Sequence, residues 1–139
     1  MSNDDVVEVL NELIENCKDG EFGFKACAER VASTELRTLL LQRGEECRVA
    51  AQELQGWVVQ CGGKPESGGT AGGALHRGWV SVRGAITGHD DHAILEECER
   101  GEDVAKARYT KALKNELPEG VRAVVERQAV GAQRNHDLI

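Results

Sequence analysis

A small set of acidic and histidine side chains lies where the apolar faces of the predicted helices turn polar. Carboxylate and imidazole groups inside a helical bundle are ligands that bind iron, manganese or zinc. The candidate metal ligands are Glu21, Glu102 and His136, with Glu46 and Glu99 as assisting carboxylates. These positions raise the hypothesis of a reduced di-iron-like site in a metal-binding or oxidoreductase-type protein.

The complete ligand set of a di-iron bundle is absent from the sequence. Such a site takes one Glu from each of two helices and a Glu-x-x-His pair from each of the other two, because residues i and i+3 project from the same side. The residues three positions before the four histidines are Gly73, Ile86, His89 and Gln133. None of them is Glu, so a full di-iron centre is not predicted.

The alternative for the same positions is a polar layer without metal. Arg43 interrupts the apolar stripe of the second predicted helix, and its guanidinium can neutralise Glu21 or Glu102. Gln128 and His136, on the last predicted helix, can complete the hydrogen bonding. In this interpretation a guanidinium–carboxylate pair stands where a ferritin holds iron, and no cofactor is needed.

Motifs for other kinds of catalysis are missing, so we assign no catalytic and no cofactor-binding residues. The sequence contains no G-x-S-x-G, P-loop or dinucleotide fingerprint. Its five cysteines form no C-x-x-C or C-x-C pair, which argues against zinc ribbons and thioredoxin-like sites. Cys17, Cys47 and Cys98 fall on apolar stripes, so we expect buried, reduced thiols. Thiol-based metal storage or redox use is the other interpretation of these cysteines.

Length and charge limit the class of protein. The 139 residues correspond to a single domain, 1–139, and 40% of them are hydrophobic, which is enough to build a core without disulfides. Seventeen basic and 24 acidic residues give a net charge of −7, which argues against nucleic acid or an anionic membrane as partner. No apolar run reaches the roughly 20 residues of a membrane span, and the acidic N-terminus is unlike a signal peptide. We therefore expect a soluble, cytoplasmic protein.

The spacing of apolar residues predicts four long helices and an all-α fold. Apolar side chains recur every three or four positions, and the chain has only two prolines. Tight turns join the first helix to the second and the third to the fourth, whereas a Gly-rich stretch separates the second from the third. One long crossover is typical of a ferritin-like four-helix bundle. The predicted helices span 4–31, 34–62, 91–116 and 118–139, with a short fifth helix at 73–87 in the crossover.

The two halves of the sequence share a pattern. The segment IENCKDGE (14–21) aligns with LEECERGE (95–102), and the Cys, Gly and final Glu coincide. Either a helical hairpin has been duplicated or two amphipathic helices are alike by chance. Under duplication, Glu21 and Glu102 occupy equivalent positions.

Four motifs carry a resemblance that covers nearly the whole chain. They are LIENCKDGEFGF (13–24), GALHRGW (73–79), AITGHDDHAILEECERGED (85–103) and LPEGVRAVVERQ (117–128), which His136 follows. Together they resemble a bacterial ferritin-like four-helix-bundle family known only as a domain of unknown function. The resemblance implies a four-helix bundle with a crossover helix, and it implies no established activity.

The sequence thus favours a non-catalytic bundle protein that acts by self-association or by binding a protein partner. A homo-oligomer or a complex with another protein is expected, and no cofactor is expected. The alternative is the metal-binding or oxidoreductase-type protein described above, with iron, manganese or zinc as the metal.

Overall fold

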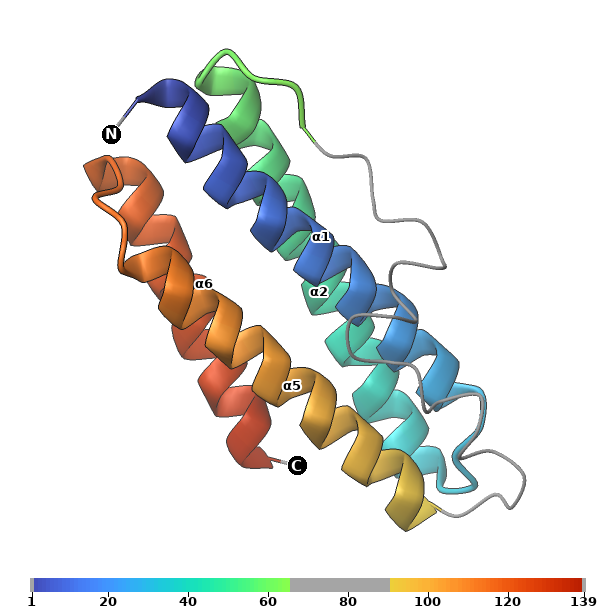
Figure 1. Ribbon diagram of the computed structural model, residues 1–139. Coiled ribbons are helices and arrows are strands. Elements are labelled where there is room, and N and C mark those ends of the chain that lie inside the picture. The colour runs from blue at the N-terminus through green and yellow to red at the C-terminus, as the bar shows by residue number, and fades with distance from the viewer. Residues whose placement is uncertain (1, 66–90, 139) are drawn as a thin grey trace.

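The structure, a computed structural model, describes residues 2–65 and 91–138, with side chains in the second range as far as Arg134. Four helices make up most of this part of the chain (Figure 1): α1 (Asn3–Ala28), α2 (Thr34–Gln60), α5 (Asp91–Leu113) and α6 (Glu119–Leu138). The described residues contain no strand, which confirms the all-α class for them. The short helix predicted at 73–87 lies outside the described residues.

The helix ends follow from local capping. Ser2 and Asp5 form a capping box at the start of α1, with the Asp5 N–H donating to Ser2 Oγ at 3.2 Å. The Ser33 hydroxyl caps α2 by accepting from the Leu36 N–H at 3.3 Å. Gly62 ends α2 with φ at 81°, in the left-handed region that favours glycine. Helix α1 ends at Ala28, three residues before the predicted end. Val31, which lies inside the predicted range, is buried from the turn that follows α1.

Contacts between the helices fix their directions. Near the start of α1, Glu12 pairs with Lys111 at the end of α5, with 3.8 Å between Oε2 and Nζ. At the other end, the Asp91 carboxylate at the start of α5 accepts from the Ala32 and Ser33 N–H groups at 2.8 and 3.2 Å. Helix α5 therefore runs antiparallel to α1 and parallel to α2 (Figure 1). This order differs from a plain up-down-up-down bundle, in which α5 would start beside the end of α2.

Each helix has two neighbours and one helix across the diagonal. Helix α1 packs against α2 and α5, and α6 packs against α5 and, more thinly, against α2. Helices α2 and α5 therefore face each other diagonally across the centre of the bundle. None of the four helices combines the length and hydrophobicity that a membrane crossing requires.

The apolar core consists of two clusters along the bundle axis. The smaller cluster draws on α1, α2, α5 and the α1–α2 turn. Its buried members are Phe24, Cys27, Ala28, Val31, Leu40, Ile94 and Cys98. The larger cluster draws on all four helices and on Leu117 in the α5–α6 turn. Its buried members are Val6, Leu10, Leu13, Ile14, Cys17, Ala51, Leu54, Val58, Tyr109, Ala112, Leu117, Val121 and Val125.

Helices α1 and α2 approach closely between the two clusters because glycine faces side chains there. A Cβ at Gly20 would lie 2.9 Å from Cys47 Sγ, and a Cβ at Gly44 would lie 3.2 Å from Lys25 Cγ. Both contacts would be tighter than ordinary van der Waals packing allows. Because Gly20 and Gly44 have no side chain, α1 and α2 pack closely at the level of the bundle where the polar residues lie.

Candidate functional site

A chain of hydrogen bonds connects all four helices within the larger cluster. The Tyr109 hydroxyl on α5 donates to Gln128 Oε1 on α6 at 2.9 Å. Gln128 Nε2 in turn donates to Glu53 Oε1 on α2 at 2.9 Å and to the Ala50 carbonyl at 3.3 Å. On the other side, Cys17 Sγ on α1 lies 3.5 Å from the Tyr109 hydroxyl oxygen. The Gln128 amide thus accepts through Oε1 and donates through Nε2, and these bonds determine which way the amide group points.

Glu53 closes this network as a carboxylate. Partial burial would raise its pKa, but hydrogen bonds from Arg127 and Gln128 outweigh burial and lower the pKa of Glu53 below its usual value. Arg127 on α6 also forms an ion pair with Glu53. The negative charge is therefore held at the α2–α6 contact by donors from a single helix.

The thiol and the phenol of the network are held in their neutral forms. Burial raises the pKa of Cys17 to about 11, although the hydrogen bond with Tyr109 opposes part of that rise. Burial also raises the pKa of Tyr109 well above its usual value, and the neighbouring Cys17 adds to the effect. A protonated thiol is a poor nucleophile. The network is therefore suited to holding helices together rather than to nucleophilic chemistry.

A buried ion pair crosses the diagonal of the bundle between the two apolar clusters. Arg43 Nε on α2 lies 3.9 Å from Glu102 Oε1 on α5, and the two side chains are only 4% and 6% exposed. Arg43 also pairs with the more exposed Glu46, with 3.6 Å between Nη1 and Oε2. Opposite charges that are buried together avoid the cost of an isolated charge in the core.

The other predicted polar residues are dispersed. Glu21 pairs with Lys25 at 2.9 Å and Lys18 at 3.8 Å on its own helix, with 18% of its side chain exposed. Gln128 belongs to the Tyr109 network described above. His136 lies in the last turn of α6, and its side chain lies outside the described part of the structure.

The described residues do not fit a di-iron centre. In the part of the chain that the structure describes, no group of three or more His, Cys, Asp or Glu side chains could hold a metal ion. Glu99 is exposed on α5, and Glu46 is turned to Arg43. The guanidinium of Arg43 places a positive charge beside Glu102, where a metal ion would need the carboxylate. One candidate ligand, His136, has its side chain outside the described part of the structure, so the metal site stays a prediction.

Cys47 lies between the network and the ion pair, where its charge state is constrained. Burial, followed by the charges of Cys17, Glu46, Glu102 and Glu21, raises the pKa of Cys47 well above its usual value. Its sulfur packs against Gly20. Cys47 is therefore a neutral thiol that fills the gap opened by that glycine.

Sequence analysis missed three of the residues that make these contacts between helices. Sequence analysis did not single out Tyr109, although a buried tyrosine hydroxyl needs a partner, and that requirement was the available signal. Glu53 gave no signal, because an acidic residue on a helix face is usually exposed. The Asp91 carboxylate accepts from the α1–α2 turn, a contact between residues far apart in the sequence that no local pattern indicates.

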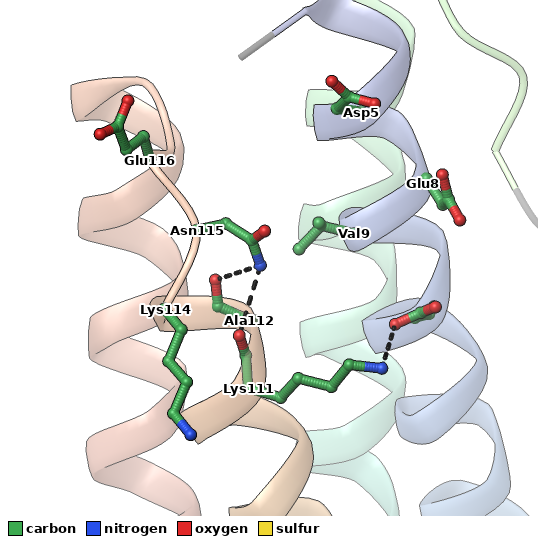
Figure 2. Close-up of a pocket in the computed structure, with 9 residues that line it drawn as sticks. Asp5, Glu8, Val9, Lys111, Ala112, Lys114, Asn115 and Glu116 are labelled. Atoms are coloured by element: carbon green, nitrogen blue, oxygen red, sulfur yellow. Dashed lines mark hydrogen bonds and ion pairs between the residues drawn. The ribbon is translucent and has the colours of Figure 1, made fainter.

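A groove of about 570 Å³ lies between the first turns of α1 and the end of α5 (Figure 2). Figure 2 shows Lys111 reaching from α5 across to α1, where its partner is Glu12. The Asn115 amide donates to the carbonyls of Lys111 and Ala112 at 3.3 and 3.1 Å, which closes the last turn of α5. These polar groups serve the helix end and the α1–α5 contact, so we assign no ligand to the groove.

Comparison with known proteins gives one family. The model of a family described as a domain of unknown function (DUF2383) matches residues 5–115, which include all of α2 and α5 and nearly all of α1. A search among curated proteins found no match.

The Tyr109–Gln128 hydrogen bond should contribute to stability. Tyr109→Phe removes the donor and leaves Gln128 Oε1 without it, so we expect the free energy of unfolding in urea to fall by about 1 kcal/mol. Thr110→Val is the matched control, because it removes an exposed hydroxyl from the next position and should change stability by less than about 0.5 kcal/mol. In a double-mutant cycle with Gln128→Leu, a coupling energy near zero would contradict the prediction.

The buried ion pair should show a strong asymmetry between single and double substitutions. Arg43→Met leaves the Glu102 carboxylate buried without its cation, so we expect a loss of about 3 kcal/mol or more in the free energy of unfolding. Arg43→Met combined with Glu102→Leu should recover most of that loss. Arg48→Met, which breaks the more exposed pair with Glu45, serves as the control. An Arg43→Met loss no larger than the control would show that the buried pair is unimportant.

Proposed function

The chain belongs to the DUF2383 family of unknown function, and we propose that it acts as a non-catalytic helical bundle that binds a second copy of itself. The observation that supports this proposal is the outer face of α2. Leu41, Val49 and Val59 on this helix are 47%, 50% and 60% exposed. Aliphatic side chains gathered on one exposed helix face are typical of an association surface.

The spacing of these residues suits a symmetric partner. Leu41 and Val59 are 18 positions apart, which is about five helical turns, so both project from the same side of α2. If two copies of α2 pair in antiparallel fashion about a two-fold axis midway between Leu41 and Val59, Leu41 of each copy lies opposite Val59 of the other. A two-fold interface requires this self-complementarity.

Charges on the outer face of α2 do not oppose association. Glu45 accepts a hydrogen bond from Arg48 Nε at 2.9 Å, so the two charges neutralise each other within the helix. This hydrogen bond lowers the pKa of Glu45 below its usual value. Glu45 and Arg48 lie four and seven positions after Leu41, on the side of α2 that carries Leu41 and Val59. A neutralised pair there can approach a second copy without like-charge repulsion.

We further propose that the bundle is ferritin-like, with Arg43 and Glu102 as a polar layer in place of metal. Support comes from the parallel course of α2 and α5, which is the order expected of a bundle with one long crossover. The described cysteines are free, which suits a reducing compartment such as the cytoplasm.

Self-association can be tested by the mass of the protein in solution. We expect sedimentation equilibrium at about 100 µM to give twice the chain mass of 15.1 kDa. Leu41→Glu and Val59→Glu should each weaken the dimer at least about tenfold, because each buries a charge in the interface. Val130→Glu, at an exposed apolar position on α6, should leave the dimer intact. A monomer at every concentration would refute the proposal and direct the search to a different protein partner.

Elemental analysis separates the proposal from the metal-binding alternative. Purified, untagged protein loaded anaerobically with iron, manganese or zinc should retain no stoichiometric metal after dialysis, because Arg43 already neutralises Glu102. Glu21→Ala, Glu102→Ala and His136→Ala provide the comparison. Metal bound at one equivalent or more and lost in these variants would instead support the reduced di-iron-like site.

A further inference from the structure

The outer face of α2 carries a continuous stripe of side chains, all of them exposed or half-buried. Successive members are four and three positions apart in alternation, which is the spacing that keeps one side of a helix against a partner helix. In chain order the stripe is apolar at its first position, charged at the next two, amide at the next two and apolar at its last. We call these residues the α2 stripe: Leu41, Glu45, Arg48, Gln52, Gln55 and Val59.

We propose that the α2 stripe selects a second copy of this chain in antiparallel orientation, because that orientation sets every charged side chain of the stripe opposite an amide. This inference rests on the proposed self-association. It adds to it the residues that determine the orientation and the choice of partner, which are Glu45, Arg48, Gln52 and Gln55.

Positions that face each other in the antiparallel pair lie at equal distances from the midpoint of the stripe. Arg48 and Gln52 lie two positions to either side, so Arg48 of each copy faces Gln52 of the other. Glu45 and Gln55 lie five positions to either side and face each other in the same way. A Gln amide offers both an acceptor for the guanidinium and donors for the carboxylate. Each charge therefore meets a neutral group with which it can form a hydrogen bond.

The ion pair within each helix can persist in this arrangement. Arg48 donates to Glu45 Oε2 through Nε at 2.9 Å, and it also donates to Glu45 through Nη2. Neither bond uses Nη1, whose hydrogens can therefore serve as donors to Gln52 of the second copy. Polar contacts at the centre of a helix pair lower its stability compared with apolar ones, but they fix its register.

Parallel pairing would set each residue of the stripe opposite its own counterpart. Glu45 would then face Glu45, and Arg48 would face Arg48. The ion pair has no net charge, but parallel pairing brings its like-charged ends together, which is unfavourable. The stripe thus disfavours the parallel pair by repulsion and favours the antiparallel pair by hydrogen bonding.

The same pattern favours a second copy over an unrelated helix. A partner must present amides to Glu45 and Arg48 and charged groups to Gln52 and Gln55, with apolar residues at both ends. Helix α2 of another copy meets these requirements when it runs in the opposite direction. Such self-complementarity is what a two-fold interface requires.

Substitutions at Gln52 test the central contact in the full chain by sedimentation equilibrium. Gln52→Glu places a carboxylate opposite Arg48 of the second copy, so we expect the Kd of the dimer to fall at least about threefold. Gln52→Arg places two guanidinium groups opposite each other, so the Kd should rise at least about tenfold. Net charge alone predicts the opposite order, because the chain already carries −7. Gln42→Glu, at an exposed position of α2 outside the stripe, is the matched control and should change the Kd less than about twofold.

Disulfide trapping gives a second readout of orientation. Leu41→Cys and Val59→Cys are prepared separately in a Cys61→Ala background and oxidised with glutathione disulfide, alone and after mixing. Both positions are exposed, so the variants should keep the helix content of the wild type. In the antiparallel pair each new cysteine lies about 27 Å along the helix axis from its own counterpart, but opposite the cysteine of the other variant. We therefore expect a linked dimer only from the mixture, with one chain of each kind identified by intact mass.

The possible outcomes distinguish a wrong orientation from a failure to self-associate. Linked dimers from either cysteine variant alone, or weaker association of both Gln52 variants, would overturn the antiparallel inference and leave self-association in place. An unchanged Kd in both Gln52 variants would also overturn it, as would a protein that sediments as a dimer and gives no linked dimer in the mixture. Wild-type protein that stays monomeric at every concentration would refute self-association and this inference with it.

Discussion

The centre of this bundle is governed by the cost of placing charge in an apolar core. Arg43 and Glu102 meet across the diagonal between α2 and α5, and the apolar core lies on either side of them as two clusters. A buried pair of this kind contributes little net stability compared with apolar residues of the same size, but it penalises any arrangement that separates the partners. Since α2 and α5 lie across the diagonal from each other, the pair is a constraint on how the two hairpins are set against each other.

The helices were predictable because the signals that determine them are local. Apolar spacing, Ser2 and Ser33 at the helix starts and Gly62 at the end of α2 each act within a few residues. The predicted ends erred where tertiary burial extends past a helix, as at Val31, which packs into the core from a turn.

The polar contacts were only partly predictable because they depend on how each helix is rotated about its own axis and on its position along the bundle axis. The sequence indicated that Arg43 would meet Glu21 or Glu102, and the structure brings it to Glu102. Glu21 and Glu102 match in the two half-sequences, yet Glu21 remains with lysines of its own helix. The difference arises from the partners of each helix: α1 lies against α2 at close approach, whereas α5 faces α2 across the diagonal. Equivalent sequence positions therefore have unequal environments.

The Asp91 carboxylate has a consequence for how the protein assembles. It accepts from the Ala32 and Ser33 N–H groups, which belong to a turn some 58 residues earlier in the chain. Short helical hairpins form quickly from local contacts, whereas contacts of long sequence separation come later. The amide hydrogens of this turn thus have an acceptor only after the second hairpin has docked. Their exchange with solvent deuterium measures hairpin docking separately from helix formation.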